Sequence, residues 1–232
     1  MRYFLICILF CGAAAFGACS ANNSSTAPGP AAEKAAPAQP SPSKSVAKIV
    51  AFGDSLTAGY GLSESESYPA LLEKKLSADG FNYEVVNAGV SGDTSAGGLR
   101  RIDWALDGDV KVVILELGAN DILRGQPIPA MRQNLAEIIK RIQSRGAIVL
   151  LAGMEAPTST GVEYRKDVHE AYTSLAREYG VAYLPFLLDR VAGVESLNQR
   201  DGIHPNAEGA RIVAENVYQA LKPLLDKEAA AN

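Results

Sequence analysis

Residues 46–226 are predicted to form an α/β domain, a three-layer α/β/α sandwich around a central five-stranded parallel sheet. Two observations lead to this fold class. Five short apolar runs, rich in β-branched residues, alternate with longer amphipathic stretches. The runs are mostly apolar and do not alternate regularly with polar residues, which is typical of strands that helices cover on both faces.

The expected strands follow one another along the whole domain. They are, in order, 49–52, 83–86, 110–117, 147–154 and 181–184. The stretches between them carry apolar residues at helical spacing, and the clearest stripe is formed by Met131, Leu135, Ile138, Ile139 and Ile142. Three helices are expected to end at a glycine just before a strand, because glycine readily adopts the left-handed conformation. These glycines are Gly80, Gly146 and Gly180.

The first residues of the chain differ in composition from the domain. Residues 1–18 are expected to be a bacterial lipoprotein signal peptide, because a short apolar segment precedes small residues and then Cys19, the expected site of lipidation. Phe16 departs from that signal, which usually has leucine three residues before the cysteine. Two alternatives are a secreted protein cut near Ala18 and an uncleaved anchor.

Residues 19–45 are rich in Ala, Pro and Ser and are expected to be a disordered tether. Residues 227–232 are expected to be a short tail. A tether behind a lipidated cysteine lets a domain stand off a membrane. We therefore expect a periplasmic protein of the bacterial cell envelope, either anchored by lipid, with the outer membrane as the expected site, or secreted.

Charge and composition exclude several classes of function. The formal net charge of the 232 residues is −4, so a basic surface for nucleic acid is not expected. All three cysteines lie within the first 19 residues, and the chain has only two histidines, His169 and His204. Neither a disulfide framework nor a structural zinc site is therefore expected.

Ser55 directly follows the first expected strand, in the turn Gly53-Asp54-Ser55. The point where a buried strand turns into a helix is a common place for a nucleophile. By itself this position is equally compatible with Asp54 or Ser55 capping the next helix. A serine needs a general base to react at neutral pH, so the other polar loops must decide between the two interpretations.

His204 is the candidate base, because an imidazole changes charge near neutral pH. Asp201 stands three residues before it, and Gly202 allows the backbone to turn so that the carboxylate can hold the imidazole. The other histidine, His169, lies within an amphipathic stretch beside acidic residues and is expected on the surface of a helix.

Donors for a developing oxyanion can come from three loops that follow strands. They are the backbone N–H groups of Ser55 and Gly92 and the carboxamide of Asn120. In a parallel sheet such loops share the edge where ligands bind. Neighbouring polar residues have plainer expected roles. Asp54 and Asp93 are expected to cap helices or hold turns, Asp121 is expected to brace the Asn120 loop, and Arg100 and Arg101 are expected on a solvated helix face.

Four of these segments, in this order, resemble the sequence blocks of the SGNH, or GDSL, hydrolase family. They are Gly53-Asp54-Ser55-Leu56, the glycine-centred segment at Gly92, Gly118-x-Asn120-Asp121 and Asp201-x-x-His204. The resemblance covers residues 48–225. Further stretches are similar to the bacterial periplasmic branch known as acyl-CoA thioesterase I, protease I, lysophospholipase or arylesterase. These are Gly59-Tyr60-Gly61, Ser91-Gly92-Asp93-Thr94, Glu116-Leu117-Gly118, Leu123-Arg124-Gly125 and Asp201-Gly202-Ile203-His204-Pro205-Asn206.

The resemblance implies a flavodoxin-like SGNH hydrolase fold and a catalytic triad that acts on a small-molecule substrate without metal or cofactor. We expect a monomer. Ser55 would be the nucleophile, His204 the base and Asp201 the residue that orients the base. The oxyanion hole would consist of the Ser55 and Gly92 N–H groups and the Asn120 side chain. The α/β-hydrolase nucleophile motif does not fit, because Thr57 stands where that motif has glycine.

The resemblance further implies a serine esterase or thioesterase acting on aryl, short-to-medium acyl or lysophospholipid esters and on acyl thioesters. The substrate pocket is expected to include Tyr60, Ile122, Met154 and Pro157. Glu155 lies in a loop that is apolar in members of the branch tuned to long acyl chains, which argues against long chains. The alternatives are an envelope glycan O-deacetylase of the same family and a catalytically idle lipoprotein that binds acyl groups or glycans.

Overall fold

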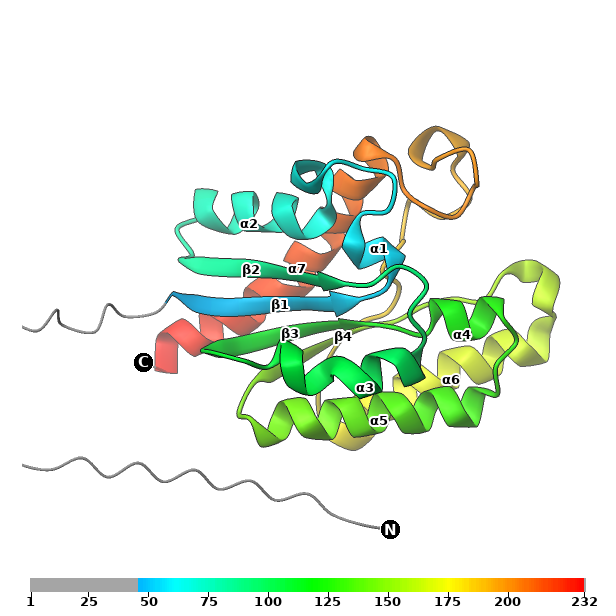
Figure 1. The fold of residues 1–232 in the computed structure, drawn as a ribbon, viewed down its shortest axis with the longest axis horizontal. Helices are drawn as coiled ribbons and strands as arrows, with labels where there is room; N and C mark the ends of the chain where they lie inside the picture. The colour runs from blue at the N-terminus through cyan, green and yellow to red at the C-terminus, as the bar shows by residue number, and fades with distance from the viewer. Residues whose placement is uncertain (1–45, 232) are drawn as a thin grey trace, which may run out of the picture. The chain divides into compact units, whose positions relative to one another are not determined.

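A five-stranded parallel sheet forms the middle of the structure, a computed structural model that describes residues 46–231 (Figure 1). The strands are β1 (Ala47–Gly53), β2 (Tyr83–Gly89), β3 (Val110–Glu116), β4 (Ile148–Ala152) and β5 (Ala182–Leu184). Their order is β2-β1-β3-β4-β5, and every neighbouring pair is parallel. The predicted fold class and all five predicted strands are confirmed.

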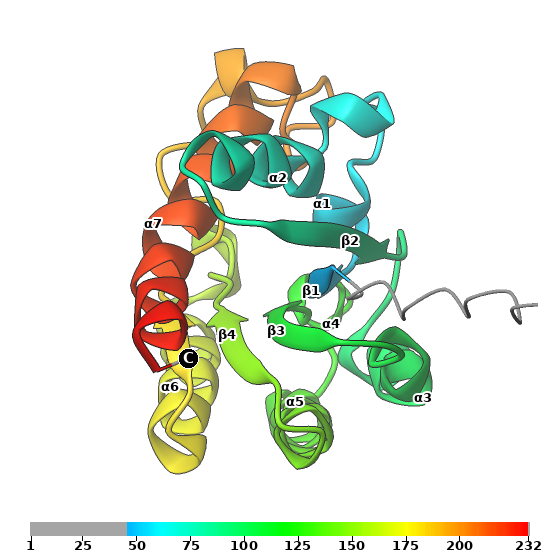
Figure 2. The ribbon, with the colours of Figure 1, turned by 90° about the vertical axis from the view of Figure 1, so that its left-hand side faces the viewer.

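Helices cover both faces of the sheet, as the end-on view of Figure 2 shows. The first face carries α2 (Tyr68–Ala78) and α7 (Ala207–Ala231), which contact each other. The opposite face carries α3 (Ser95–Ala105), α5 (Ile128–Ser144) and α6 (Val162–Tyr179), with α5 in contact with both neighbours. The short helices α1 (Ser55–Ala58) and α4 (Ala119–Leu123) lie at the carboxyl ends of β1 and β3 (Figure 1). Three 3₁₀ turns, Glu64–Glu66, Thr158–Thr160 and Glu195–Leu197, complete the described elements.

The apolar strands and helical stripes form the core that the sequence predicts. Residues 49–52 of β1 and 112–115 of β3 are almost completely buried. The α5 stripe faces the same core, and all of its predicted members are fully buried: Met131, Leu135, Ile138, Ile139 and Ile142. Burying a side chain of this size contributes about 1.5–3 kcal/mol relative to leaving it exposed. The core therefore fixes the positions of the strands, and with them the positions of the polar side chains at the strand ends.

The three predicted helix-ending glycines all adopt positive φ angles, 85° at Gly80, 78° at Gly146 and 61° at Gly180. The last helix differs from the prediction at its far end. Helix α7 continues through Ala231, although a tail was expected from residue 227, and the Tyr83 hydroxyl donates to Glu228 across 2.8 Å. The sequence signal was weak there because an alanine-rich end carries little amphipathic pattern.

The predicted signal peptide 1–18, the lipidated Cys19 and the tether 19–45 lie outside the described residues. Within residues 46–231, no helix is both long and apolar enough to cross a membrane. Anchoring at Cys19 therefore stays a prediction from the sequence.

Candidate active site

The predicted site residues meet at the carboxyl edge of the sheet, around the point where the strand order reverses. Strand β2 lies on one side of β1 and strand β3 lies on the other, so the order reverses between β1 and β3. In parallel sheets of this kind, ligands bind at the carboxyl ends of the strands at this point. Ser55 begins α1 directly after β1, and Asn120 lies in α4 directly after β3. Gly92 follows β2, and His204 precedes α7. All four line the same cavity.

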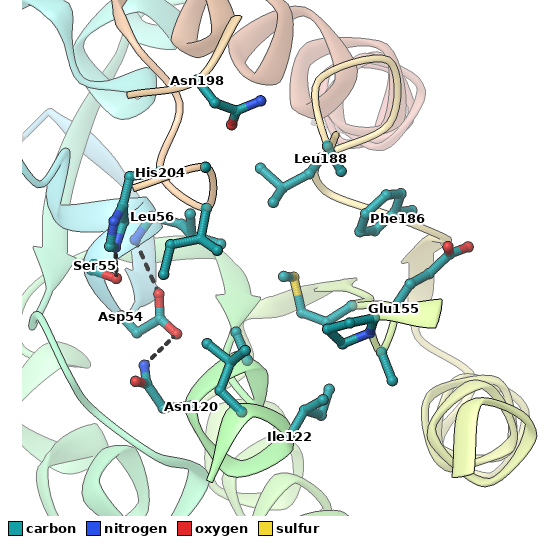
Figure 3. A pocket seen from close by; sticks show the side chains of 18 of the residues that line it. Asp54, Ser55, Leu56, Asn120, Ile122, Glu155, Phe186, Leu188, Asn198 and His204 are labelled. Carbon is teal, nitrogen blue, oxygen red and sulfur yellow. Dashed lines mark hydrogen bonds between the residues drawn. The ribbon is translucent and has the colours of Figure 1, made fainter. Parts of the chain in front are cut away.

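A chain of short hydrogen bonds links Ser55, His204 and Asp201. The Ser55 Oγ lies 2.9 Å from Nε2 of His204, and Nδ1 of His204 lies 2.7 Å from Oδ2 of Asp201 (Figure 3 shows the first of these contacts). The other carboxylate oxygen, Oδ1 of Asp201, accepts the backbone N–H groups of Ile203 and His204, both at 3.0 Å. These bonds, from the His204 ring first, lower the pKa of Asp201 to about 2.

The ionised Asp201 determines which nitrogen of His204 carries the proton. A carboxylate only accepts hydrogen bonds, so its contact with Nδ1 places the proton there. Nε2 is then the acceptor that faces the Ser55 hydroxyl. The Tyr60 ring packs beside the imidazole, with centroids 4.7 Å apart and an interplanar angle of 40°. The imidazole is thus oriented from both sides.

Asn120 is held by contacts on both ends of its carboxamide. Its Nδ2 donates to Oδ2 of Asp54 at 2.9 Å (Figure 3), and Arg124 donates to its Oδ1 at 3.4 Å. Arg124 also donates to the Gly92 carbonyl at 3.0 Å, so it bridges the two loops that carry the predicted oxyanion donors. These contacts leave the second N–H of the Asn120 amide as a donor for a ligand.

Asp54 caps α1 and is completely buried. Its Oδ1 accepts the Leu56 N–H at 3.0 Å, which satisfies a donor of the first helical turn (Figure 3). Burial raises the pKa of Asp54, while the bonds from Leu56 and Asn120 and the nearby His204 act in the opposite direction. The predicted capping role of Asp54 is confirmed, and the same carboxylate also orients Asn120.

The cavity beside Ser55 has a volume of about 680 Å³. The four residues predicted to form a substrate pocket all lie in its wall: Tyr60, Ile122, Met154 and Pro157. The segment after β5 adds Phe186 and Leu188, which the sequence analysis did not single out. In Figure 3, Ser55 and His204 lie on one side of the cavity, and Phe186 and Glu155 lie on the other. The walls between them are mainly apolar.

Arg101 corrects the expectation that it belongs to a solvated helix face. Its guanidinium donates to Asp93 at 2.6 Å and to the carbonyls of Ala88 and Gly53, both at 2.8 Å. It also lies over the Phe52 ring, 4.0 Å from the centroid. Asp93 is therefore the partner of Arg101 and not a helix cap. Together they tie the loop containing Gly92 to the ends of β1 and β2.

Replacing Arg101 with methionine should lower the free energy of unfolding by about 2–3 kcal/mol, because a partly buried carboxylate and two carbonyls lose a charged donor. Urea unfolding followed by circular dichroism measures this change. The matched control is Arg100→Met, which changes the exposed neighbour on the same helix and should alter stability very little. Equal effects of the two substitutions would contradict the structural role of Arg101.

Two further expectations concern Asp121 and His169. Asp121 is buried and accepts the Ser95 N–H at 2.7 Å and the Ser95 hydroxyl at 2.6 Å, so it braces the start of α3 against α4. His169 is exposed on α6, as predicted. Residues 46–231 contain no cluster of three His, Cys, Asp or Glu side chains placed to hold a metal ion.

Comparisons with known proteins show the family of this chain. A model of the GDSL-like Lipase/Acylhydrolase family matches residues 51–212. The chain is 42% identical over 178 residues to Esterase TesA of Pseudomonas aeruginosa, covering 76% of this chain and 89% of that protein. It is 36% identical over 181 residues to Thioesterase 1/protease 1/lysophospholipase L1 of Escherichia coli, covering 78% of this chain and 86% of that protein.

A solved structure is similar to this chain as well. The psychrotrophic esterase EstA from Pseudoalteromonas sp., in a structure inhibited by monoethylphosphonate, matches with a TM-score of 0.73 and 33% identity, covering 77% of this chain and 98% of that chain. The family model spans well over half of the chain, and the relatives align over most of their own length. The chain therefore belongs to the GDSL-like lipase/acylhydrolase family of hydrolases.

Proposed function

We propose that the protein is a serine esterase and thioesterase that works through an acyl-enzyme, with Ser55 as nucleophile, His204 as general base and Asp201 as the residue that orients it. The observation that carries this proposal is the continuous hydrogen-bond chain from Asp201 through His204 to the Ser55 Oγ. Asp201 also accepts two backbone N–H groups, and the Tyr60 ring packs beside His204, so both partners of Ser55 are held in place.

In the first half of the reaction, Ser55 Oγ attacks the acyl carbonyl while Nε2 of His204 takes the hydroxyl proton. The carbonyl oxygen becomes an oxyanion. His204 then gives the proton to the departing alcohol or thiol, and the carbon–oxygen or carbon–sulfur bond breaks. In the second half, His204 takes a proton from water, the hydroxide attacks the acyl-enzyme, and Ser55 regains its proton as the carboxylic acid leaves.

The oxyanion is proposed to bind the Ser55 and Gly92 N–H groups and the Asn120 amide. Donors of this kind are each worth about 3–4 kcal/mol when they are fixed before the reaction begins. The contacts of Asp54 and Arg124 with Asn120 support this role, because they prevent the amide from rotating as charge develops. The φ of 82° at Gly92 supports it too, since a side chain there would strain the turn that presents its N–H.

The proposed substrates are aryl and short-to-medium acyl esters, lysophospholipid esters and acyl thioesters. Relatives named esterase, arylesterase and thioesterase 1/protease 1/lysophospholipase L1 support this range. The cavity supports the limit on chain length. An acyl chain gains about 0.8 kcal/mol for each CH₂ that it buries along the apolar wall. On the side of the cavity away from Ser55, the carboxylate of Glu155 makes contact with further CH₂ groups of a longer chain unfavourable.

A series of p-nitrophenyl esters tests the proposal, with butyryl-CoA as the thioester arm. We expect kcat/KM to be highest between butyrate and octanoate and to fall for palmitate, and we expect a fluorophosphonate probe to label the folded protein. Strong preference for acetylated oligosaccharides over these esters would instead indicate a glycan O-deacetylase. A folded protein that neither hydrolyses nor reacts with the probe would be a binding protein, and the proposal would be wrong.

We also propose that the enzyme acts in the periplasm, attached through Cys19 to the outer membrane by a lipid. The sequence before residue 46 supports this location, since small residues precede a cysteine and a proline-rich tether follows. Mass spectrometry of the N-terminal peptide of envelope-extracted protein decides the matter. An unmodified Cys19 would contradict the anchor and leave the enzymatic proposal intact.

A further inference from the structure

Glu116 is a fully buried acid that the proposed reaction does not use. It is the last residue of β3 and lies beside Gly53, the last residue of the neighbouring strand β1. Its side chain reaches under α1, the helix that follows β1. One carboxyl oxygen, Oε2, accepts the backbone N–H of Asp54 at 3.1 Å and the Thr57 hydroxyl at 2.8 Å. A single oxygen therefore binds the residue before Ser55 and the second residue after it.

The surroundings of Glu116 are shaped around this contact. The Tyr68 hydroxyl, from the start of α2, lies 3.1 Å from the Thr57 hydroxyl and extends the network to a third element. A Cβ atom at Gly53 would lie 2.3 Å from Oε2 of Glu116 and 2.1 Å from the Thr57 hydroxyl. Glycine is therefore required at the end of β1 so that the acid from β3 can reach α1.

Two buried carboxyl groups, Asp54 and Glu116, share this region, and their partners differ. Asp54 accepts an N–H from Leu56 and one from Asn120, and the nearby His204 favours its ionised form. The second oxygen of Glu116, Oε1, is buried without a hydrogen-bond partner among the described residues. A buried charge needs partners, whereas a neutral acid needs fewer. Repulsion between the two carboxyl groups favours a single negative charge, and the nearby His204 favours that charge on Asp54 and the proton on Glu116.

We propose that Glu116 is a positioning residue for Ser55, whose neutral carboxyl group locks Asp54 and Thr57 and so aims the serine hydroxyl at His204. This inference rests on the proposed function, because it assigns Glu116 a role in presenting the proposed nucleophile. Through Asp54, Glu116 also affects Asn120. The same lock holds its carboxylate against Asn120, so one buried acid sets the direction of both the nucleophile and an oxyanion donor.

The substitution that removes the lock is Glu116→Ala, and we expect kcat for p-nitrophenyl butyrate to fall by about 10²-fold, the cost of misplacing a reacting group by about 1 Å. KM should change little, because the cavity wall is untouched. Glu116→Gln should restore kcat close to wild type, since an amide oxygen can accept both hydrogen bonds. Thr57→Val, which removes one of the two donors with little change of shape, should give an intermediate kcat.

Glu84→Ala serves as the matched control, because Glu84 is an exposed glutamate on β2 of the same sheet and should leave kcat unchanged. The rate at which a fluorophosphonate probe labels Ser55 should follow kcat across the series. If Glu116→Ala does not fold, Glu116→Gln and Thr57→Val still carry the test. A Gln variant as impaired as the Ala variant would show that charge is required and would overturn the proposal, as would normal kcat in folded Glu116→Ala or in Thr57→Val.

The charge state of Glu116 gives a second readout. Burial, followed by repulsion from Asp54, raises the pKa of Glu116 well above its usual range. The ionisable groups that face it from other elements are Asp54, Tyr68 and Tyr172, and burial raises the pKa of both tyrosines, so neither ionises near neutral pH. A carboxyl whose pKa is raised by folding stabilises the folded state below its unfolded pKa, and that stability is lost as pH rises.

Glutamine does not titrate, so the urea midpoint of Glu116→Gln relative to wild type should increase steadily from pH 5 to pH 8. A constant or decreasing difference would show that Glu116 is ionised when folded and would overturn its neutral form. Failure of this inference is distinguishable from failure of the proposed function. In the first case wild type remains active and Ser55 is labelled, while Glu116→Ala is normal; in the second, wild type itself shows neither hydrolysis nor labelling.

Discussion

Replacing Ser55 with alanine should lower kcat for p-nitrophenyl butyrate by about 10⁴–10⁶-fold, because it removes the atom that forms the acyl-enzyme. The oxyanion donors and the cavity remain, so a small residual rate above that in water is expected. Substrate binding should change little. Activity assays with purified protein, together with intact-protein mass spectrometry after addition of a fluorophosphonate, measure both the loss of rate and the loss of labelling.

The same substitution should leave the free energy of unfolding nearly unchanged. Asp54, not Ser55, caps α1, so the cap survives, and alanine is the best helix former among ordinary residues. The matched control is Ser77→Ala, an exposed serine in the last turn of α2, which should keep full activity. Substantial hydrolysis by folded Ser55→Ala would show that another group is the nucleophile and would contradict the proposed mechanism.

Replacing Asp201 with asparagine should lower kcat by about 10⁴-fold through the wrong tautomer of His204. The structure determines how the new amide must lie. The Ile203 and His204 N–H groups point at Oδ1, so the asparagine oxygen occupies that position and its NH₂ group faces Nδ1. Nδ1 must then accept, which places the proton on Nε2. Nε2 can no longer take the proton of the Ser55 hydroxyl.

The pH dependence of catalysis should not arise from Asp201. Since the pKa of Asp201 is lowered to about 2, its carboxylate stays ionised at any pH at which the enzyme is assayed. The stability that the ionised form contributes is present above its unfolded pKa and is lost only as pH falls toward 2. A decline of wild-type kcat/KM at a pH well above 2 would therefore report a group other than Asp201.

Asp167→Asn, at an exposed position on α6, is the control for Asp201→Asn and should retain wild-type kcat. Circular dichroism should show both variants folded. Wild-type activity in folded Asp201→Asn would mean that another group orients His204.

The fold could be predicted in detail because its signals are local. Apolar runs such as 112–115 have one stable environment, the middle of a sheet covered by helices, and glycines such as Gly180 mark where helices end. The end of α7 was not predictable in this way. Its last turn is alanine-rich and is held by Glu228 and Tyr83, which are 145 positions apart in the sequence.

The site residues Ser55, Gly92, Asn120, Asp201 and His204 were identified because loops that follow parallel strands must share an edge and because their spacing resembles a known family. Arg101 and Glu116 were not identified. A basic residue on an amphipathic helix is usually solvated, and a single acid at the end of an apolar strand is ambiguous. Their partners, the ends of β1 and β2 for Arg101 and α1 for Glu116, come from distant parts of the chain.

The sequence by itself therefore determined the layers, the strands and the chemical types that converge at one edge. The layers and strands follow from periodicity, a pattern that extends over a few residues. The chemical types follow from the polar loops that come after the strands. The tertiary structure decided which acid caps α1, which acid is buried beneath it and which way the Asn120 amide faces. Those outcomes depend on distances of about 3 Å between groups far apart in sequence, in an interior where an unpaired charge or amide is costly.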